Sequence, residues 1–158
     1  MSMVAKARKD LKQTKRSACP EEEVFLNIQR TAELLSWGIN ETLKKVELTP
    51  TQYNVLRILR GAGQAGVSCS EVGERMITKD SDITRLLDRL EARGLISRER
   101  EAKDRRVIIT RITDEGLSVL KGLDEPIVEC HRQQLGHLGS KQLTSLSKLL
   151  EAARGQAE

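Results

Sequence analysis

Four consecutive charged residues, at positions 103–106 (KDRR), stand directly before a β-branched run at positions 107–110 (VIIT). One interpretation of this charge is an ordinary solvated turn. In the other, an arginine enters the narrow, electronegative minor groove of DNA, and Asp104 pairs with a guanidinium, whose fork a carboxylate matches. Alternation along a strand places Arg105 and Arg106 on different faces, so only one of them need point at DNA.

A second group of candidate residues lies at positions 81–94 (SDITRLLDRLEARG). Apolar residues at positions 83, 86, 87 and 90 have the i, i+3, i+4, i+7 spacing of one helix face. The opposite face carries polar and charged side chains: Ser81, Thr84, Arg85, Asp88 and Arg89. Hydroxyl and guanidinium groups near the start of a helix suit base edges and phosphates. An ordinary solvated face would carry the same residues, so the neighbouring elements must decide between the two interpretations.

Those neighbouring elements are predicted to be a helix-turn-helix and a hairpin. Ser68 can cap a short helix, with Glu71 as its capping-box partner. A short break then leads to the helix at 82–93, which Gly94 ends. After Gly94 the pattern becomes strand-like, and "LISRE" and "RVIITRI" predict two strands with a polar loop between them. A hairpin that follows two short helices in this way is the layout of a winged helix-turn-helix.

Longer helices are predicted on both sides of this head. Pro20 suits the first turn of one helix, and Thr49, Pro50 and Gln52 form the start of another, which ends at the glycines of positions 61 and 63. Thr113 can cap a long helix, in which Pro126 predicts a kink or a break. A last helix is predicted from a Ser140 cap, with one buried side: Leu143, Leu146, Leu149 and Leu150. The predicted fold is therefore mainly α with a small β-hairpin, a winged helix-turn-helix with N- and C-terminal helical flanks.

Composition and charge agree with a nucleic-acid ligand. The chain has 158 residues and a net charge of +4, with 2% aromatic residues, which favours an aliphatic helical protein. Positions 1–16 carry six Lys or Arg and one acid, and positions 75–111 carry eleven basic and seven acidic residues. Such clustering is typical of polyanion binding, although short basic arms are also common and often disordered. No stretch is long and apolar enough to predict a membrane span, and no apolar run follows the basic N-terminus to predict a secretory signal. Three widely spaced cysteines form no disulfide framework, so a reducing, cytoplasmic compartment is expected.

Other kinds of site have weaker support. No Gly-rich phosphate loop, nucleophile elbow or paired-acid motif is present, so we expect no enzyme and no cofactor. The spacing of Cys130, His131 and His137 matches no tight ligand pattern, so no metal is expected. Cys69 is expected to pack in the core, and Cys130 to be buried or at a seam. Cys19 precedes a helix start, which leaves redox sensing as an alternative, although three glutamates follow it.

Four segments together resemble the MarR family of bacterial transcriptional regulators: "LTPTQYNVLRIL", "SEVGERM", "ITRLLDRLEARGLISRE" and "DRRVIITRITDEG". The resemblance covers roughly residues 20–155. It implies a homodimer whose terminal helices interlock, and a wing whose Asp/Arg pair braces the loop and reaches the minor groove. It favours Arg106 as the arginine that points at DNA. It also implies release of DNA by a small, aromatic or acidic effector or by cysteine oxidation. The peroxide-sensing branch has tyrosines near its cysteine, whereas this chain has one tyrosine, Tyr53.

These observations predict a transcriptional regulator, and more specifically a repressor, that binds a pseudo-palindromic double-stranded DNA operator as a homodimer. Residues 1–19 are expected to form a basic, disordered arm, and residues 20–155 a single domain. Within that domain, residues 20–46 and 114–155 are the predicted dimerisation helices, and residues 49–112 the DNA-binding head. The alternative is a winged-helix module for protein–protein interaction, because this fold serves both purposes.

Overall fold

The computed structural model describes residues 19–77, 82–101 and 106–155, and the chain divides into two compact units, Met1–Ser36 and Trp37–Glu158. Helix α2 (Pro20–Lys44) starts in the first unit and ends in the second. It begins at Pro20 as predicted, and Glu21, Glu22 and Glu23 occupy its first turn. Carboxylates at this end stabilise the helix by interacting with the positive end of its dipole.

The first helix of the head lies in the second unit, and its start was predicted in detail. Helix α3 (Pro50–Ala62) has both hydrogen bonds of a capping box, in which Gln52 N–H donates to the Thr49 hydroxyl and Thr49 N–H donates to the Gln52 side chain. The helix runs through Gly61 and ends at Gly63, so only the second of the two predicted glycines stops it. A single turn, η1 (Gly63–Ala65), follows.

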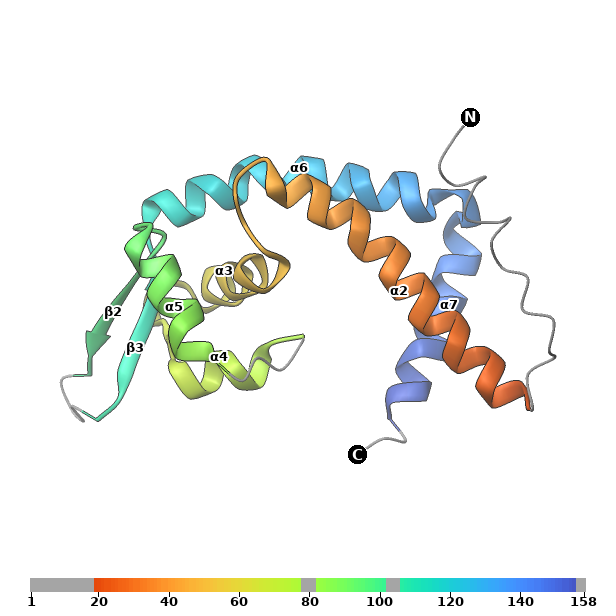
Figure 1. Cartoon of the computed structure of the whole chain (residues 1–158), viewed down its shortest axis with the longest axis horizontal. Coiled ribbons are helices and arrows are strands. Elements are labelled where there is room, and N and C mark those ends of the chain that lie inside the picture. Colours follow the sequence, from red (N-terminus) through yellow and green to blue (C-terminus); the bar gives the residue numbers. More distant parts are fainter. Residues whose placement is uncertain (1–18, 78–81, 102–105, 156–158) are drawn as a thin grey trace. The chain divides into compact units, whose positions relative to one another are not determined.

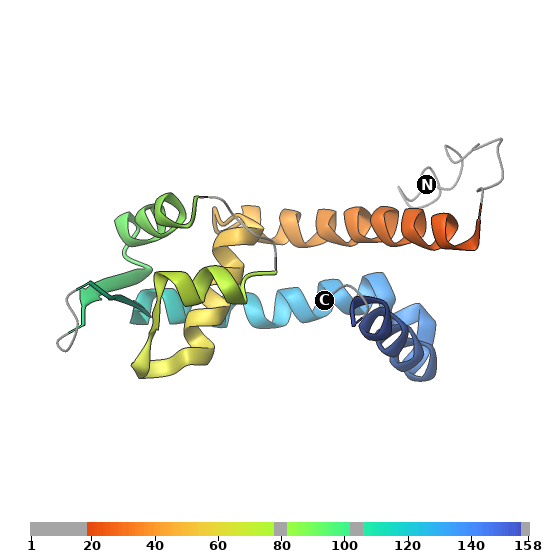
Figure 2. The same ribbon diagram turned by 90° about the horizontal axis from the view of Figure 1, so that it is seen from below.

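Two short helices and a hairpin come next, as predicted, and Figure 1 shows them packed around α3. Helix α4 (Cys69–Arg75) and helix α5 (Ile83–Ala92) form the helix-turn-helix. Strands β2 (Ile96–Arg100) and β3 (Ile108–Ile112) pair antiparallel, with Arg98 opposite Thr110. Figure 2 shows both strands beside α5, extending away from α3 and α4.

The sheet has a third strand that the sequence did not predict. Strand β1 (Val67–Ser68) pairs antiparallel with β3, so the strand order is β1-β3-β2. It is only two residues long, too short to show any alternation of apolar and polar residues. Gly66 precedes it with φ of +68°, and a Cβ there would lie 2.7 Å from the Thr110 carbonyl oxygen. Both facts favour glycine at this turn.

One aliphatic core holds the head together, and it includes residues from the flanking helices. The predicted stripe of α5 is buried at Leu86, Leu87 and Leu90, and Ile83 is partly buried against it. The same cluster contains side chains from the end of α2, from α3, from β2 and from α6: Leu43, Val55, Leu56, Leu59, Ile96, Leu120, Leu123 and Ile127. The core of the head therefore extends beyond positions 49–112. The predicted division into head and dimerisation helices remains a prediction.

Helix α6 (Asp114–Leu135) is capped by Thr113, whose hydroxyl accepts from Gly116 N–H at 3.1 Å, as predicted. It continues through Pro126, so the chain does not break there, and the other predicted outcome, a kink, stays a prediction. The buried residues Leu123 and Ile127 stand on either side of the proline. Burial of each contributes about 1.5–3 kcal/mol, which together offsets the roughly 3 kcal/mol that an interior proline costs.

The last helix differs from prediction at its start and in its burial. After the turn η2 (Gly136–Leu138), helix α7 (Gly139–Arg154) begins at Gly139 and has no side-chain cap, so the predicted Ser140 cap is wrong. Gly139 has φ of +71°, and this backbone conformation turns the chain into the helix without a capping side chain. The leucines predicted to be buried are not buried within this chain, and Leu149 is 69% exposed. Across the described residues, every helix is too short or too polar to cross a membrane.

Candidate nucleic-acid interface

Helix α5 begins at an aspartate that also holds an arginine. Asp82 caps the helix, because its Oδ1 accepts from Arg85 N–H at 3.2 Å. Its other oxygen lies 3.4 Å from Arg85 Nε, so one carboxylate contacts both the backbone and the side chain of Arg85. The side chain of Arg85 is still 76% exposed. Its guanidinium is therefore directed at the helix start yet open to solvent.

The predicted polar face of α5 is exposed. Thr84, Arg85 and Arg89 are all exposed, whereas Leu86, Leu87 and Leu90 point into the core. Ser81 lies outside the described residues. The exposed residues thus include a hydroxyl and two guanidinium groups on one helix, the groups that can bond base edges and phosphates. Their contact with DNA stays a prediction.

The hairpin carries the other predicted group. Arg106 is exposed and lies two residues before β3, where Glu101 N–H donates to the Val107 carbonyl at 2.9 Å and extends the pairing of the two strands. Asp104 and Arg105 lie outside the described residues, and so does the predicted pairing of Asp104 with a guanidinium. The structure therefore places one of the three predicted hairpin residues, at the far end of the sheet from α6.

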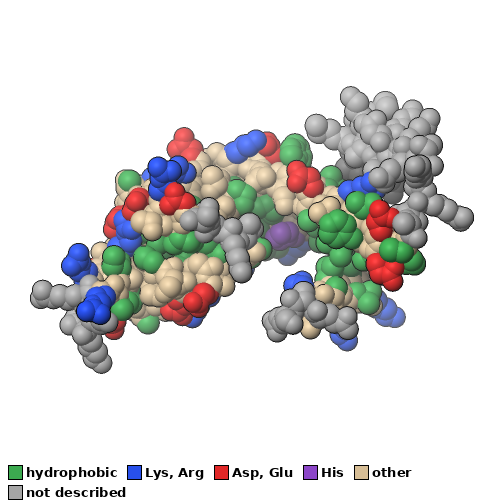
Figure 3. Space-filling model, turned by 60° about the horizontal axis from the view of Figure 1, so that its bottom comes forward, with side chains coloured by type: hydrophobic (Ala, Val, Ile, Leu, Met, Phe, Trp, Pro, Cys, Tyr) green, Lys and Arg blue, Asp and Glu red, His purple; other side chains and the backbone are tan. Residues whose placement is uncertain are grey.

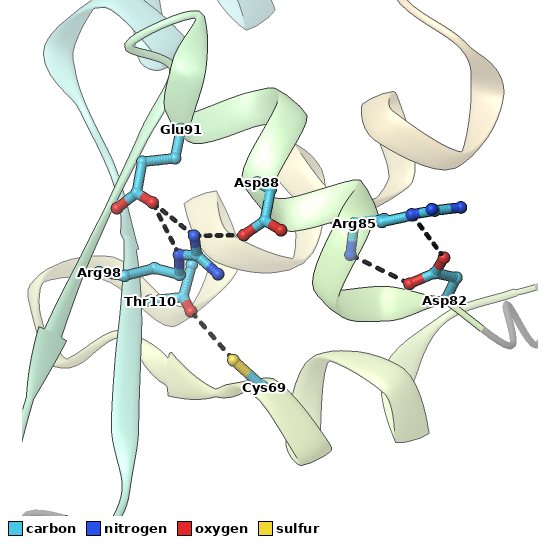
Figure 4. A network of polar contacts seen from close by, with 7 residues as sticks. All are labelled: Cys69, Asp82, Arg85, Asp88, Glu91, Arg98 and Thr110. Atoms are coloured by element: carbon cyan, nitrogen blue, oxygen red, sulfur yellow. Dashed lines mark hydrogen bonds and ion pairs between the residues drawn. The ribbon is translucent and has the colours of Figure 1, made fainter.

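A fourth arginine, Arg98, which the sequence reasoning missed, joins α5 to the sheet. Arg98 on β2 donates from Nη2 to Asp88 Oδ1 at 2.5 Å, and from Nη2 and Nε to Glu91 Oε2 at 2.5 and 3.0 Å. Figure 4 shows its guanidinium between the two carboxylates of α5, while the Arg85 side chain points away from this cluster. Only 18% of the Arg98 side chain is exposed. The hydrogen bond with Glu91 is the main cause of a raised pKa of Arg98; burial opposes it, and Asp88 adds to it.

A signal for Arg98 was present in the sequence. Side chains two residues apart point to the same face of a strand, so Arg98 shares the inward face of the buried Ile96. An arginine on an inward face needs anionic partners, and Asp88 and Glu91 are spaced i, i+3 on one helix. Asp88 was predicted only to lie on the exposed polar face of α5. It is exposed, as expected, but its carboxylate is bound to Arg98.

Other polar contacts fix both ends of the helix-turn-helix. Ser68 caps α4 as predicted, through Glu71 N–H at 3.2 Å, but the Glu71 carboxylate pairs with Arg75. Ile77 N–H donates to Asn54 Oδ1 on α3 at 3.0 Å, which fixes the chain after α4. At the end of α5, the Arg93 guanidinium donates to the Val46 and Glu47 carbonyls at 3.1 and 2.6 Å. The helix pair is thus anchored to the elements before it.

The surface of this region is mixed in charge. Figure 3 shows basic and acidic side chains interspersed over the end of the molecule that carries α5 and the hairpin. Several acids there are paired with arginines: Asp82, Asp88, Glu91 and Glu99. The exposed guanidinium groups of Arg85 and Arg89 therefore lie on a surface where several carboxylates are already paired with arginines.

The cysteines lie apart from these residues. Cys69 is half-buried, with its sulfur 3.9 Å from the Thr110 hydroxyl, and packs against the core as expected. Cys130 is half-buried beside Gly38, where a Cβ would lie 3.0 Å from its sulfur. Cys19 is exposed. Among the described residues, no group of three or more His, Cys, Asp or Glu side chains could hold a metal ion.

Comparison with known proteins connects this geometry to a family. The model of the MarR family matches residues 48–108. The HTH-type transcriptional repressor MdtR of Bacillus subtilis is 39% identical over 94 residues, which are 60% of this chain and 59% of MdtR. The chain thus spans less than two thirds of the length of that relative.

Solved structures match over a greater length. The crystal structure of a MarR transcription factor from Planctomyces limnophilus is 38% identical, with a TM-score of 0.67 over 87% of this chain and 99% of that one. A MarR family transcriptional regulator from Streptomyces coelicolor, solved in complex with DNA, is 24% identical. Its TM-score is 0.79, over 90% of this chain and 94% of that one, and this likeness concerns the fold alone.

Proposed function

The chain belongs to the MarR family of transcriptional regulators, and on this premise we propose that it represses transcription by binding a pseudo-palindromic DNA operator as a homodimer. In this proposal α5 lies in the major groove, and Thr84, Arg85 and Arg89 contact bases and phosphates. The hairpin carries Arg106 to the adjacent minor groove. Ser81, Asp104 and Arg105 belong to the same proposed interface.

The exposed face of α5 is the observation that carries this proposal. Three side chains able to bond DNA are exposed on one helix, and the opposite face is anchored in the core by Leu86, Leu87 and Leu90. A helix that reads DNA needs this combination, because base contacts demand a fixed position. The relative from Streptomyces coelicolor, which has the same fold, was solved in complex with DNA.

Exposed apolar side chains support the homodimer. In the first unit, Val24, Phe25 and Leu34 on α2 are each more than half exposed, at 55%, 58% and 56%. In the second unit, Leu149 on α7 is 69% exposed. Side chains as apolar and as exposed as these are what the surface covered by a partner would carry on terminal helices. A second copy of the chain would bury them and place two recognition helices about 34–36 Å apart, or a multiple of this distance.

Selection from a random pool of DNA duplexes tests the proposal. The full chain should enrich one sequence with inverted symmetry, whose half-sites lie about one helical turn apart, or a multiple of it. The alternative, a winged-helix module for protein–protein interaction, predicts retention of duplexes without any enriched sequence. Recovery of unrelated sequences after repeated rounds would therefore refute sequence-specific binding.

The proposal also includes release of DNA by a small aromatic or acidic effector. The described part of the chain holds three aromatic side chains, Phe25, Trp37 and Tyr53, of which the first two are more than half exposed. An effector would have to bind largely aliphatic and polar side chains. Screening of aromatic and aliphatic carboxylic acids for release of the selected duplex would decide whether such an effector exists.

A further inference from the structure

We propose that Arg98 is a positioning residue for DNA reading: by binding Asp88 and Glu91 together, it fixes α5 against the sheet in the orientation that presents Arg85 and Arg89 to DNA. This inference rests on the proposed function. It adds a residue on β2, on the inward face of the strand, that takes no part in DNA contact itself.

The Arg98 guanidinium is hydrogen-bonded to two different residues of α5. Its guanidinium donates from two different nitrogens to Glu91 and from one of these to Asp88, at 2.5–3.0 Å. The two acids are three residues apart on α5, so the contacts span almost one helical turn. Two separate attachment points on a helix resist its rotation about its own axis, which a single ion pair cannot do. A planar guanidinium suits this task better than an ammonium group.

The position of Asp88 explains why this orientation matters for DNA. Along α5, Asp88 follows Thr84 and Arg85 and directly precedes Arg89, and its side chain is 53% exposed. Without Arg98, its carboxylate and that of Glu91 would be unpaired on the helix proposed to approach phosphates. Like charges at such an interface disfavour binding. Arg98 therefore both orients the helix and neutralises the acids beside its DNA-contacting arginines.

The shielding of Arg98 separates it from ordinary surface arginines. Its side chain is 18% exposed, compared with 76% for Arg85 and 64% for Arg132. Exposed ion pairs contribute little to stability or geometry because water competes for both partners. The Arg98 guanidinium is largely shielded, whereas Asp88 and Glu91 are 53% and 39% exposed, so it is the combination of two contacts on one helix that allows Arg98 to determine the position of α5.

The test compares Arg98→Gln with a matched control in binding to two duplexes, the sequence recovered by selection and a scrambled version. The control is Arg60→Gln, which removes an ion pair between two other elements, Arg60 of α3 with Asp124 of α6 at 2.9 and 3.0 Å, and leaves the contacts of α5 unchanged. Each variant is first shown to be folded by its thermal unfolding. Affinities are then measured well below the unfolding temperature, so that stability does not enter the comparison.

Arg98→Gln should weaken binding to the selected duplex roughly tenfold, and binding to the scrambled duplex less, because correct base contacts need the correct orientation. Arg98→Lys, which keeps the charge but not the fork, should recover only part of the loss. Arg60→Gln should leave the ratio of the two affinities unchanged. Asp88→Asn and Arg98→Gln should also be non-additive, because they remove the same contact.

Each outcome decides the proposal. If the wild-type chain discriminates between the duplexes and Arg98→Gln discriminates equally well, the role of Arg98 is refuted and the proposed function stands. If the wild-type chain shows no discrimination, the proposed function fails, and this inference fails with it. If Arg98→Gln does not fold, the double variant Asp88→Asn with Glu91→Gln removes both partners of Arg98 instead. It should lower discrimination in the same way, and unchanged discrimination in it would refute the proposal.

Discussion

Arginines of the winged helix differ in what their guanidinium groups contact. Arg93 donates to two backbone carbonyls and Arg98 to two carboxylates, so both are occupied by the protein itself. Arg85 Nε lies 3.4 Å from Asp82 Oδ2, and the Arg85 side chain is largely exposed. The two arginines whose guanidinium groups are bound by the protein, Arg93 and Arg98, therefore hold α5, and the side chain of Arg85 is left largely exposed to solvent.

Arg85→Ala should cost about 1–3 kcal/mol of binding free energy on the selected duplex and much less on a scrambled one. The reason is that a base contact from the start of α5 is lost, whereas most phosphate contacts remain. Titration of a labelled duplex by the variant measures both values. An equal loss on both duplexes would show that Arg85 contacts phosphate only.

Arg106→Ala should behave differently, because a wing arginine in the minor groove senses groove width and charge more than base identity. Binding should weaken on all duplexes, and the slope of log affinity against log salt should fall by about one. Preference for A·T-rich flanks should fade with it. The measurement is a titration at several salt concentrations. Unchanged affinity and slope in a folded variant would mean that positions 103–106 form only a charged turn.

At the level of elements, the sheet and α6 are joined by close contacts around Thr113 and Gly116. Thr113 N–H donates to the Leu95 carbonyl at 3.1 Å, and its hydroxyl donates to the Gly94 carbonyl at 2.7 Å. A Cβ on Gly116 would collide with the Leu95 carbonyl oxygen and lie 2.7 Å from Ile112 Cγ1. Glycine at position 116 thus allows α6 to start directly against the base of the hairpin.

Gly116→Ala should therefore lower the free energy of unfolding by about 1–3 kcal/mol, the usual effect of overpacking. Gly122→Ala is the matched control on the same helix, because a Cβ there meets nothing within 4 Å. The control should raise the free energy of unfolding by up to about 1 kcal/mol, since alanine favours a helix interior. Chemical denaturation measures both. Equal stability of Gly116→Ala and the wild type would show that the backbone at this join can shift.

Elements with local signals could be predicted from the sequence. The capping box at Thr49, the stripe of α5 and the Thr113 cap each depend on residues within one or two helical turns. The third strand, the contacts of Arg98 and the uncapped start of α7 depend on tertiary partners instead. Arg98 in particular meets Asp88 and Glu91 only after β2 turns back along α5. Burial of Leu123 and Ile127 likewise overrode the breaking tendency of Pro126.

The candidate site could be predicted in part. Four of the predicted residues are exposed, in accord with the proposed interface: Thr84, Arg85, Arg89 and Arg106. Asp88, in contrast, pairs with Arg98 of the neighbouring strand. Helical periodicity shows which face is polar, but it does not distinguish a residue that meets a ligand from one that meets the neighbouring strand. That distinction needs the position of β2 beside α5, which Figure 4 shows.

At the scale of the whole molecule, the proposal depends on two properties: the exposed polar face of α5, and the exposed apolar side chains on the terminal helices α2 and α7. A dimer would bury the apolar groups and double the number of DNA contacts, so dimerisation and operator affinity should be linked. Two chains per duplex are therefore expected at saturation. The likeness to the Planctomyces limnophilus transcription factor covers 87% of this chain, which is more than the head alone.

Titration of the full chain against the selected duplex and its scrambled version, at one salt concentration near physiological, tests sequence-specific recognition most directly. The account predicts saturation at two chains per selected duplex and an affinity at least about a thousandfold tighter than for the scrambled one. Equal affinities for the two duplexes, in a folded protein, would contradict it.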